Sequence, residues 1–438
     1  MNARSALIAA AVSCAALAQE TPAPTPHGIV LHAARLLDVV NGRIIAPGEV
    51  LVEGERISAA GASVPHPAGA QTIDLGDTTL MPGLIDVHVH LFLHPGAEDL
   101  QTVEESAPQR TILATLAARA DLMAGFTAER DMGTEGAGSA GTAVMRAIDQ
   151  GLIPGPRLRI SGNAIDILGG HEDANGFNPA QQVLSNADYA NDAEQIVATI
   201  RKQYKEGSTF VKMYETGEDS IASSEQKDKP AVAGDPEFWS FHTPYQYTQA
   251  QLKTAVDEAA RLGMNVGVHA EGEPGTLYAA QAGVASIDHA TQLSDETMRL
   301  MKEKHIPAVP TFAVLEYHVS SEPAATREHA MLEYKIREFK RQMAAGISFA
   351  VGSDVGPFPH GTQAKEFELM VRYGMTPLAV LQADYLNGAQ ILRWRGQIGE
   401  LKTGYYADVI AVPGNPLEDI TAVERVAFVM KAGVVVRK

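Results

Sequence analysis

The chain has 438 residues, of which 45% are apolar and 20% charged, and its formal net charge at pH 7 is −18. This length exceeds one ordinary domain of about 150 residues, although a large α/β barrel alone can take about 250. The negative charge argues against a nucleic acid or an anionic membrane surface as a partner, because both attract basic protein surfaces.

The N-terminus has the pattern of an export signal. Arg4 precedes an apolar run over residues 6–17, and Ala16-Leu17-Ala18 offers a small-x-small cleavage site. We therefore expect residues 1–18 to be a signal peptide and the mature protein to be exported, either periplasmic or secreted. Lipidation of Cys14, the only cysteine, is the alternative to cleavage. No later run reaches the roughly 18 apolar residues of a spanning helix.

Both ends of the mature chain are rich in short apolar runs that Gly, Asn and Pro separate. These runs predict strands at residues 28–37, 48–54, 56–60, 71–75, 407–412, 423–429 and 433–437. Neither set is large enough to close a core alone. We therefore predict that residues 27–82 and 396–438 pair into one β-sandwich that flanks a central domain.

The central residues 83–395 alternate between strand and helix patterns. The predicted strands are residues 84–90, 127–132, 157–162, 210–215, 265–270, 286–290, 307–312 and 348–354. The predicted helices are residues 106–124, 139–151, 191–206, 248–262, 275–282, 294–304, 326–345 and 376–392. Eight β-α units in series predict an α/β fold, a (β/α)8 TIM barrel, with its chemistry at the C-terminal ends of the strands.

Residues that can bind metals stand at these strand ends. His88 and His90 are two apart, so they point to the same face of a strand and offer two imidazole nitrogens. A His-x-His pair alone could equally cap a core strand, and a lysine buried in an apolar strand is costly without a partner. Six such residues at one rim nevertheless predict a metal site: His88, His90, Lys212, His269, His289 and Asp354.

This set resembles the amidohydrolase superfamily, as do the flanking strands and the tail Ile398–Ile410, and the resemblance covers nearly the whole mature chain. The segments Phe210–Tyr214, Gly169–Asp173 and Pro310–Phe312 are similar to the imidazolonepropionase-like branch, which contains Xaa-Pro dipeptidases. Within that branch the chain most resembles the bacterial amidohydrolases that hydrolyse ochratoxin A.

The resemblance implies a centre of two divalent metal ions, usually zinc. His88, His90 and Asp354 would hold one ion, His269 and His289 the other, and Lys212, carbamylated by carbon dioxide, would bridge them. Carbamylation turns a buried ammonium group into an anionic oxygen donor. A hydroxide shared by the metals would attack the amide, with Asp354 as general base and then general acid. Relatives commonly form homo-oligomers, often octamers.

Two alternatives remain open at this point. The sequence His269-Ala-Glu271 is similar to mononuclear deaminase and cyclic-amide hydrolase branches, which need no bridging lysine; Lys212 argues against them. The second alternative is a metal-free scaffold protein. We expect Asp288 to face away from the site because it neighbours His289 on the same strand.

The predicted function is hydrolysis of the amide bond of a small molecule, a dipeptide or an N-acyl or N-aroyl amino acid such as ochratoxin A, which would give ochratoxin alpha and phenylalanine. Such substrates carry a carboxylate, for which His171 and Tyr214 are the candidate binding residues. The connection over residues 217–247 far exceeds the usual 2–6 residues and is rich in aromatic side chains, which predicts a lid or a subunit contact. Leu93, His94 and the loop Val355–Gly361 are expected at the same entrance.

Overall fold

The computed structural model describes residues 28–96, 98–173, 178, 180, 183–217, 244–321 and 327–438. The predicted signal peptide with Cys14, and residues 218–243 of the long connection, lie outside the described residues. Among the helices that are described, none combines the length and apolar character needed to cross a membrane.

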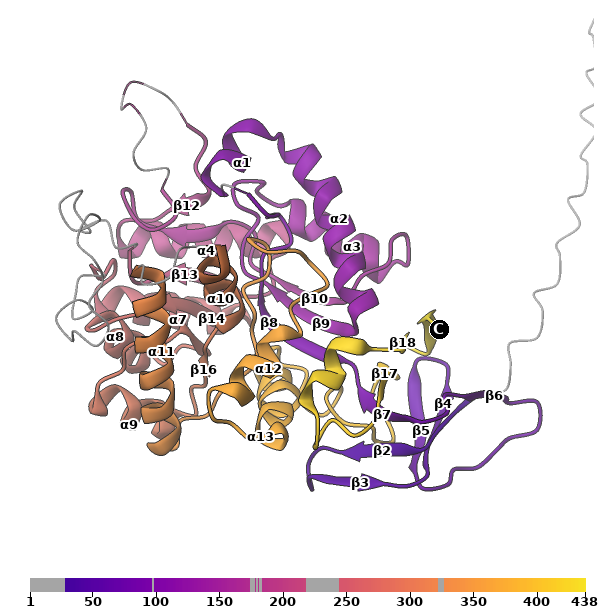
Figure 1. Ribbon diagram of the computed structural model, residues 1–438. Helices are drawn as coiled ribbons and strands as arrows, with labels where there is room; N and C mark the ends of the chain where they lie inside the picture. The colour runs from indigo at the N-terminus through magenta and orange to yellow at the C-terminus, as the bar shows by residue number, and fades with distance from the viewer. Residues whose placement is uncertain are drawn as a thin grey trace, which may run out of the picture.

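The two ends of the chain come together in one sheet. This six-stranded sheet has the order β19-β18-β17-β7-β2-β3. Strand β7 from the N-terminal part pairs antiparallel with β17 from the C-terminal part, with Leu80 opposite Ala411. Figure 1 shows the indigo and yellow strands side by side. The strands are β2 Arg35–Asp38, β3 Arg43–Ile45, β7 Thr78–Pro82, β17 Val409–Pro413, β18 Phe428–Lys431 and β19 Val434–Arg437.

A second sheet of four strands contains only N-terminal residues. Its order is β5-β4-β1-β6, with β1 Ile29–Ala33, β4 Gly48–Glu53, β5 Arg56–Gly61 and β6 Gln71–Asp74. One apolar cluster contains Leu31 and Val50 from this sheet together with Val409 and Phe428 from the six-stranded sheet. The pairing therefore joins both chain ends, whereas the sandwich arrangement and the boundaries at 27–82 and 396–438 stay predictions.

The central strands are parallel and lie in two sheets. The first has the order β10-β9-β8 and the second β12-β11-β13-β14-β15-β16. Their bounds are β8 Leu84–Val89, β9 Phe126–Asp131, β10 Arg157–Ile160, β11 Ala164–Asp166, β12 Ala187–Tyr189, β13 Val211–Tyr214, β14 Val266–Ala270, β15 Ser286–His289 and β16 Ala308–Val309.

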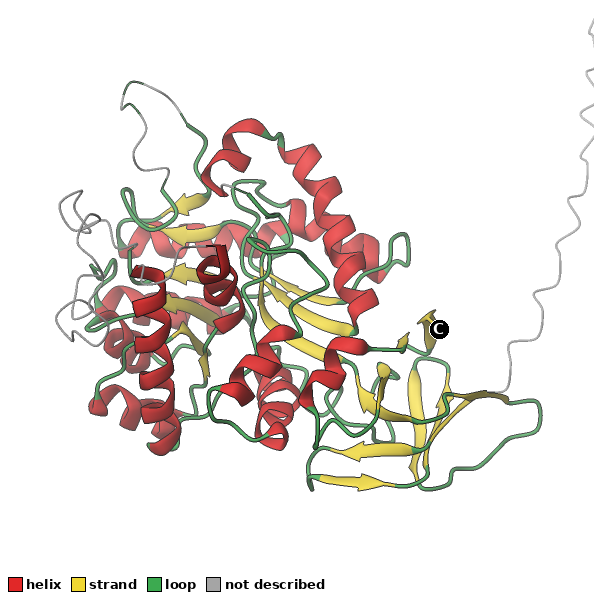
Figure 2. Cartoon of the chain, in the orientation of Figure 1, coloured by secondary structure: helices red, strands yellow, loops and turns green. Residues whose placement is uncertain are grey.

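Helices surround these strands, as Figure 2 shows. They are α1 Glu98–Glu104, α2 Ala107–Ala124, α3 Ala140–Asp149, α4 Ala193–Glu206, α7 Gln249–Arg261, α8 Gly275–Ala282, α9 Asp295–Lys304, α10 Phe312–Ser321, α11 Arg327–Ala344, α12 Lys365–Arg372, α13 Pro377–Gln382 and α14 Ala389–Ile391. A π-helical turn η1, Ala383–Gly388, joins α13 to α14, and a 3-10 helix η2 covers Ile420–Arg425. The predicted starts at Ser106 and Thr376 are confirmed, since both side chains cap the first turn of a helix.

The strand pairing does not close into one continuous barrel, and this corrects the predicted closed barrel. The predicted strand at 348–354 is not a regular strand; it is attached by isolated bridges from Phe349 to Ala308 and from Val355 to Val89. Asp354, the last residue of this segment, has a left-handed backbone with φ of 61°. The predicted strand at 307–312 likewise shortens to β16, because Thr311 has φ of 51° and α10 begins at Phe312.

The described ends of the long connection after β13 are tied to each other. The Gly217 backbone N–H donates to the Pro244 carbonyl at 2.9 Å, and the Gln246 N–H donates to the Glu215 carbonyl at 2.7 Å. Thr216 and Tyr245 form an antiparallel bridge between these bonds. The chain therefore leaves the sheet and returns to it at the same place.

Candidate metal centre

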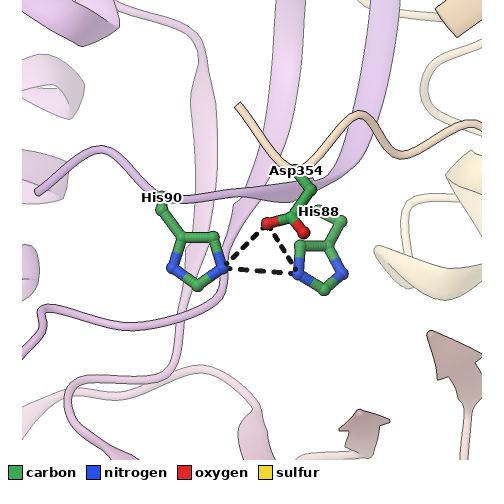
Figure 3. A group of neighbouring side chains, drawn as sticks. All are labelled: His88, His90 and Asp354. Carbon is green, nitrogen blue, oxygen red and sulfur yellow. Dashed lines mark hydrogen bonds and ion pairs between the residues drawn. The ribbon is translucent and has the colours of Figure 1, made fainter. Parts of the chain in front are cut away.

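Two histidines and one aspartate converge at the C-terminal end of β8. The Asp354 backbone N–H donates to the His88 carbonyl, and the His90 N–H donates to the Val355 carbonyl, each at 2.8 Å. Gly352 permits this approach, because a Cβ there would lie 2.9 Å from His88 Cβ. The backbone thus places the three side chains of His88, His90 and Asp354 against one another (Figure 3).

The facing atoms of these side chains form a triangle of metal-binding size. Asp354 Oδ1 lies 3.4 Å from His88 Nε2 and 3.3 Å from His90 Nε2, and the two Nε2 atoms are 3.4 Å apart. His88 and His90 are buried. Within the described part of the chain, this is the group whose ligand atoms all lie within 4.8 Å of one another.

Each of the two histidines has a carboxylate beside its Nδ1 atom. His90 Nδ1 lies 2.8 Å from Glu135 Oε1, and His88 Nδ1 lies 3.3 Å from Asp288 Oδ2. Arg130 in turn binds both oxygens of Asp288, at 3.1 and 3.0 Å. A proton on each Nδ1 leaves each Nε2 available to a metal ion, so the residues present fit a divalent cation at the triangle.

Two of the three side chains in the triangle already have the charge state that a metal ion needs. Burial lowers the pKa of His88 to about 4, so the imidazole is in the neutral form that binds metals. Burial alone would raise the pKa of Asp354, but His88 and His90 lower it overall, so this carboxylate is ionised. Burial also opposes protonation of His90, yet its bonds to Asp354 and Glu135 raise its pKa well above the ordinary value. A metal ion binding there must therefore displace a proton.

The other three predicted ligands lie at the same cavity. The His269 ring, on β14, is 4.3 Å from the His289 ring at the end of β15, and the His289 ring is 5.1 Å from that of His88. Lys212 on β13 is fully buried, and its Nζ, like His269 Nε2, has no hydrogen-bond partner among the residues that the structure describes. Burial is the largest cause of the lowered pKa of Lys212, which favours the neutral amine.

The predicted substrate-binding residues line this cavity too. The His171 ring stacks on Tyr214 at 4.6 Å with an interplanar angle of 13°, and it lies 4.3 Å from the His269 ring. Burial lowers the pKa of His171 to about 3, so this imidazole is neutral. The cavity has a volume of about 390 Å³, and Leu93 and Pro357 stand at its wall. The described lining does not include His94, which instead pairs with Glu105 at 2.9 Å.

Three residues near the site were missed by the sequence reasoning. We expected Asp288 to face away, but its Oδ2 lies 3.3 Å from His88 Nδ1 and 3.0 Å from the Arg130 guanidinium group. Glu135 and Glu172 follow strands in irregular loops, where a single carboxylate gives no pattern. The Gly-Gly-His-Glu-Asp segment at 169–173 resembles the family and could have indicated Glu172 as a site residue, but the sequence led us to predict only His171 from it.

Comparison with known proteins places the chain in a family. The model of the amidohydrolase family matches residues 79–436, so the chain belongs to this family, whose members are typically metal-dependent. Its fold neighbours are α/β proteins of the TIM-barrel type.

Three individual relatives indicate the branch of the family to which the chain is similar. The chain is 30% identical over 386 residues to an ochratoxinase of Aspergillus niger, covering 81% of this chain and 75% of that protein. It is 25% identical over 415 residues to an imidazolonepropionase of Shouchella clausii, covering 90% of this chain and 86% of that protein. The structure of a Xaa-Pro dipeptidase with bound methionine in the active site superimposes with a TM-score of 0.81 at 29% identity, covering 94% of this chain and 100% of that one. The chain is therefore a hydrolase that acts on amide bonds, in the branch that the sequence predicted.

Proposed function

We propose that this amidohydrolase uses two divalent metal ions to cleave the amide bond of a dipeptide or of an N-acyl or N-aroyl amino acid. The observation that carries the proposal is the convergence of all six candidate ligands on one cavity, with a buried lysine among them that lacks a hydrogen-bond partner in the described chain. The similarity to an ochratoxinase and to a Xaa-Pro dipeptidase supports this class of substrate.

In this proposal His88, His90 and Asp354 hold one ion, while His269 and His289 hold the other. Zinc suits such a set of imidazole nitrogens and carboxylate oxygens. When bound, divalent ions polarise an amide carbonyl and lower the pKa of water at the site.

Lys212, as its carbamate, would supply an anionic oxygen donor to the two ions. The neutral amine, which burial favours, adds to carbon dioxide to give an N–COO⁻ group and releases one proton. The product is an anionic oxygen donor in a place where an ammonium group would be repelled by two dications. Burial therefore favours the reactive neutral amine, and the charge of the two dications would favour its anionic product.

Asp354 moves the proton. Its carboxylate is ionised and faces the cavity, so Oδ1 or Oδ2 accepts a proton from the attacking water and returns it to the leaving amine. The product pair is then a carboxylic acid and an amine, each with its protons balanced. The fold holds the Asp354 carboxylate beside both His88 and His90, where it can carry this proton.

A mononuclear cyclic-amide hydrolase or deaminase is the second candidate. One observation favours it: of the four histidines and one aspartate in the proposed ligand set, only His88, His90 and Asp354 form a group with ligand atoms within 4.8 Å of one another in the described chain. The number of metal ions bound per chain distinguishes the two candidate functions, because the binuclear enzyme needs about two ions and the mononuclear enzyme needs one.

The experiment is a panel of substrates incubated with zinc-loaded protein and analysed by mass spectrometry. The panel contains Xaa-Pro dipeptides, N-acyl and N-aroyl phenylalanines including ochratoxin A, and imidazolone and aminopyrimidine rings. We expect release of proline or phenylalanine, and we expect Lys212→Ala to abolish it and to lose a metal ion by elemental analysis. Ring opening or release of ammonia, unaffected by Lys212→Ala, would assign the protein to the mononuclear branch.

Three further proposals complete this function. The two sheets that hold the chain ends form a β-sandwich beside the central domain. The protein is exported after cleavage of residues 1–18, which N-terminal sequencing of the mature protein tests. It assembles as a homo-oligomer, up to an octamer, which light scattering tests; a monomer at micromolar concentration would contradict this.

A further inference from the structure

The loop that carries His171 is irregular, yet its backbone N–H groups are all hydrogen-bonded. It covers residues 167–173 and follows β11. Every backbone N–H group in it donates a hydrogen bond, at distances from 2.6 to 3.3 Å. The loop therefore has one preferred backbone conformation, which its acceptors define. These acceptors are the carbonyls of Ile167 and Gly170 and the side chains of Asp166, Asp173, Asn191 and Gln246.

One side-chain amide joins this loop to β13. Gln246 Oε1 accepts a hydrogen bond from the His171 backbone N–H at 2.7 Å, and Gln246 Nε2 donates to the Tyr214 carbonyl at 2.8 Å. The partners fix the orientation of the amide, because a backbone N–H only donates and a carbonyl only accepts. Gln246 therefore ties together the backbones of His171 and Tyr214, the two residues whose rings stack at 4.6 Å.

Asp166, the last residue of β11, completes the attachment of the loop. Its Oδ1 accepts from the Ile167 N–H at 2.7 Å, and its Oδ2 accepts from the Glu172 N–H at 2.6 Å. Gln246 Nε2 also donates to Oδ1. Gly170 lies so close to this carboxyl group that a Cβ there would collide with it. The loop is thus held from β11 by Asp166 and from β13 by Gln246.

The position of this loop determines the shape of the cavity. His171 and Tyr214 both line the cavity, and the His171 ring lies 4.3 Å from the ring of His269. The place of Gln246 is itself set by β13, because its backbone N–H donates to the Glu215 carbonyl at 2.7 Å. A loop released from Gln246 would therefore move the His171 ring relative to Tyr214 and to the candidate metal ligand His269.

We propose that Gln246 is a positioning residue that holds His171 and Tyr214 together as one wall of the cavity and thereby sets the affinity for substrate. Gln246 is not among the described residues that line the cavity, so it acts through His171. The effect on substrate rests on the proposed amide hydrolase, whereas the effect on the loop does not.

The variants for the test follow from the hydrogen bonds. Gln246→Met has a similar length but cannot bond to the His171 N–H or to the Tyr214 carbonyl. Gln246→Ala loses the same bonds and also most of the side-chain volume, so similar effects of both variants assign the cause to the bonds. Gln249→Met is the matched control. Gln249, the first residue of α7, is also half-buried, and no hydrogen bond joins its side chain to the loop in the described chain.

The first measurement is hydrogen exchange, followed by mass spectrometry on peptides that cover residues 167–173, without substrate. Exchange of the loop should be about tenfold faster in Gln246→Met and Gln246→Ala than in the wild type, as for the loss of one hydrogen bond. Gln249→Met should leave the exchange rate unchanged. Thermal unfolding and zinc content are measured for every variant; if Gln246→Ala fails to fold, Gln246→Met supplies the comparison.

The second measurement is a double-mutant cycle between Gln246→Met and His171→Ala. The substrates are L-alanyl-L-proline and ochratoxin A, with zinc-loaded protein. Gln246→Met should raise KM severalfold and change kcat little, because it displaces a wall of the binding cavity and leaves the candidate metal ligands in place. In the His171→Ala background it should raise KM by less than about twofold, since the residue through which it acts is already absent.

Other results would overturn the inference. Unchanged exchange of the loop in both Gln246 variants does so, as do effects of Gln246→Met and His171→Ala on KM that multiply in the double variant. Failure of the proposed function has a different signature, because then the wild type cleaves neither compound. In that case the exchange rates alone support or overturn the positioning role of Gln246.

Discussion

Glu215, directly after β13, should make the stability of the protein fall as the pH rises. The side chain is buried, its Oε2 accepts a hydrogen bond from the Tyr247 backbone N–H at 3.2 Å, and its Oε1 has no hydrogen-bond partner in the described chain. Burial raises the pKa of Glu215 to about 9 from 4.5. The folded protein therefore keeps this carboxyl protonated at pH 7, whereas the unfolded chain ionises it.

The sign and size of the effect follow from this difference. The contribution of Glu215 to stability is complete below pH 4.5 and is lost progressively up to about pH 9. Each pH unit in that window costs about 1.4 kcal/mol, so the loss at pH 7 is about 3 kcal/mol. Glu215→Gln cannot ionise and keeps a carbonyl acceptor for Tyr247. The variant should match the wild type near pH 4.5 and exceed its free energy of unfolding by up to about 3 kcal/mol at pH 7.

The measurement is urea unfolding followed by circular dichroism at pH 5, 6, 7 and 8 for the wild type and Glu215→Gln. Glu55→Gln is the matched control: the Glu55 side chain is exposed, so its effect should stay constant across this range. A difference between Glu215→Gln and the wild type that does not change with pH, or that shrinks as the pH rises, would refute the reasoning.

Three further predictions concern the metal centre and the cavity. Glu135→Ala should weaken zinc binding by about 10- to 100-fold in chelator competition, because the His90 ring loses the acceptor that orients it. Glu135→Gln should retain most of the affinity. Equal zinc affinities for the wild type and both variants would count against this role of Glu135. Zinc affinity should also fall as the pH is lowered, since binding displaces a proton from His90, and a flat profile between pH 8 and 5 would contradict it. His171→Ala should raise KM severalfold with unchanged zinc content; an unchanged KM would exclude a contact with substrate.

The ends of the central strands were predictable because local patterns specify them. An apolar run that ends at His88 and His90 leaves two same-face imidazoles at the end of a strand, and with the four ligand-type residues at other strand ends this pair predicts a metal site. Helix starts were equally local, since Ser106 and Thr376 each cap a first turn with a proline just inside it.

What was not predictable depends on contacts between distant segments. Strand β16 ends early because Thr311 has a left-handed backbone, and a threonine in the sequence does not predict that conformation. Asp288 seemed to face away by strand alternation, yet Arg130 from a different strand draws it against His88. Glu135, which contacts His90, and Glu172, which lines the cavity, are 37 positions apart in the sequence, so only the folded chain brings both to the site.

The paired ends of the connection after β13 determine which changes of sequence length the fold can accept. Because Thr216 and Tyr245 bridge the two ends, residues 218–243 begin and finish at neighbouring points. A tight turn joining Gly217 to Pro244 would span that gap without moving Lys212 or Tyr214. The segment can thus be shortened or exchanged, by an engineer or by evolution, while the candidate ligands keep their places on the strands.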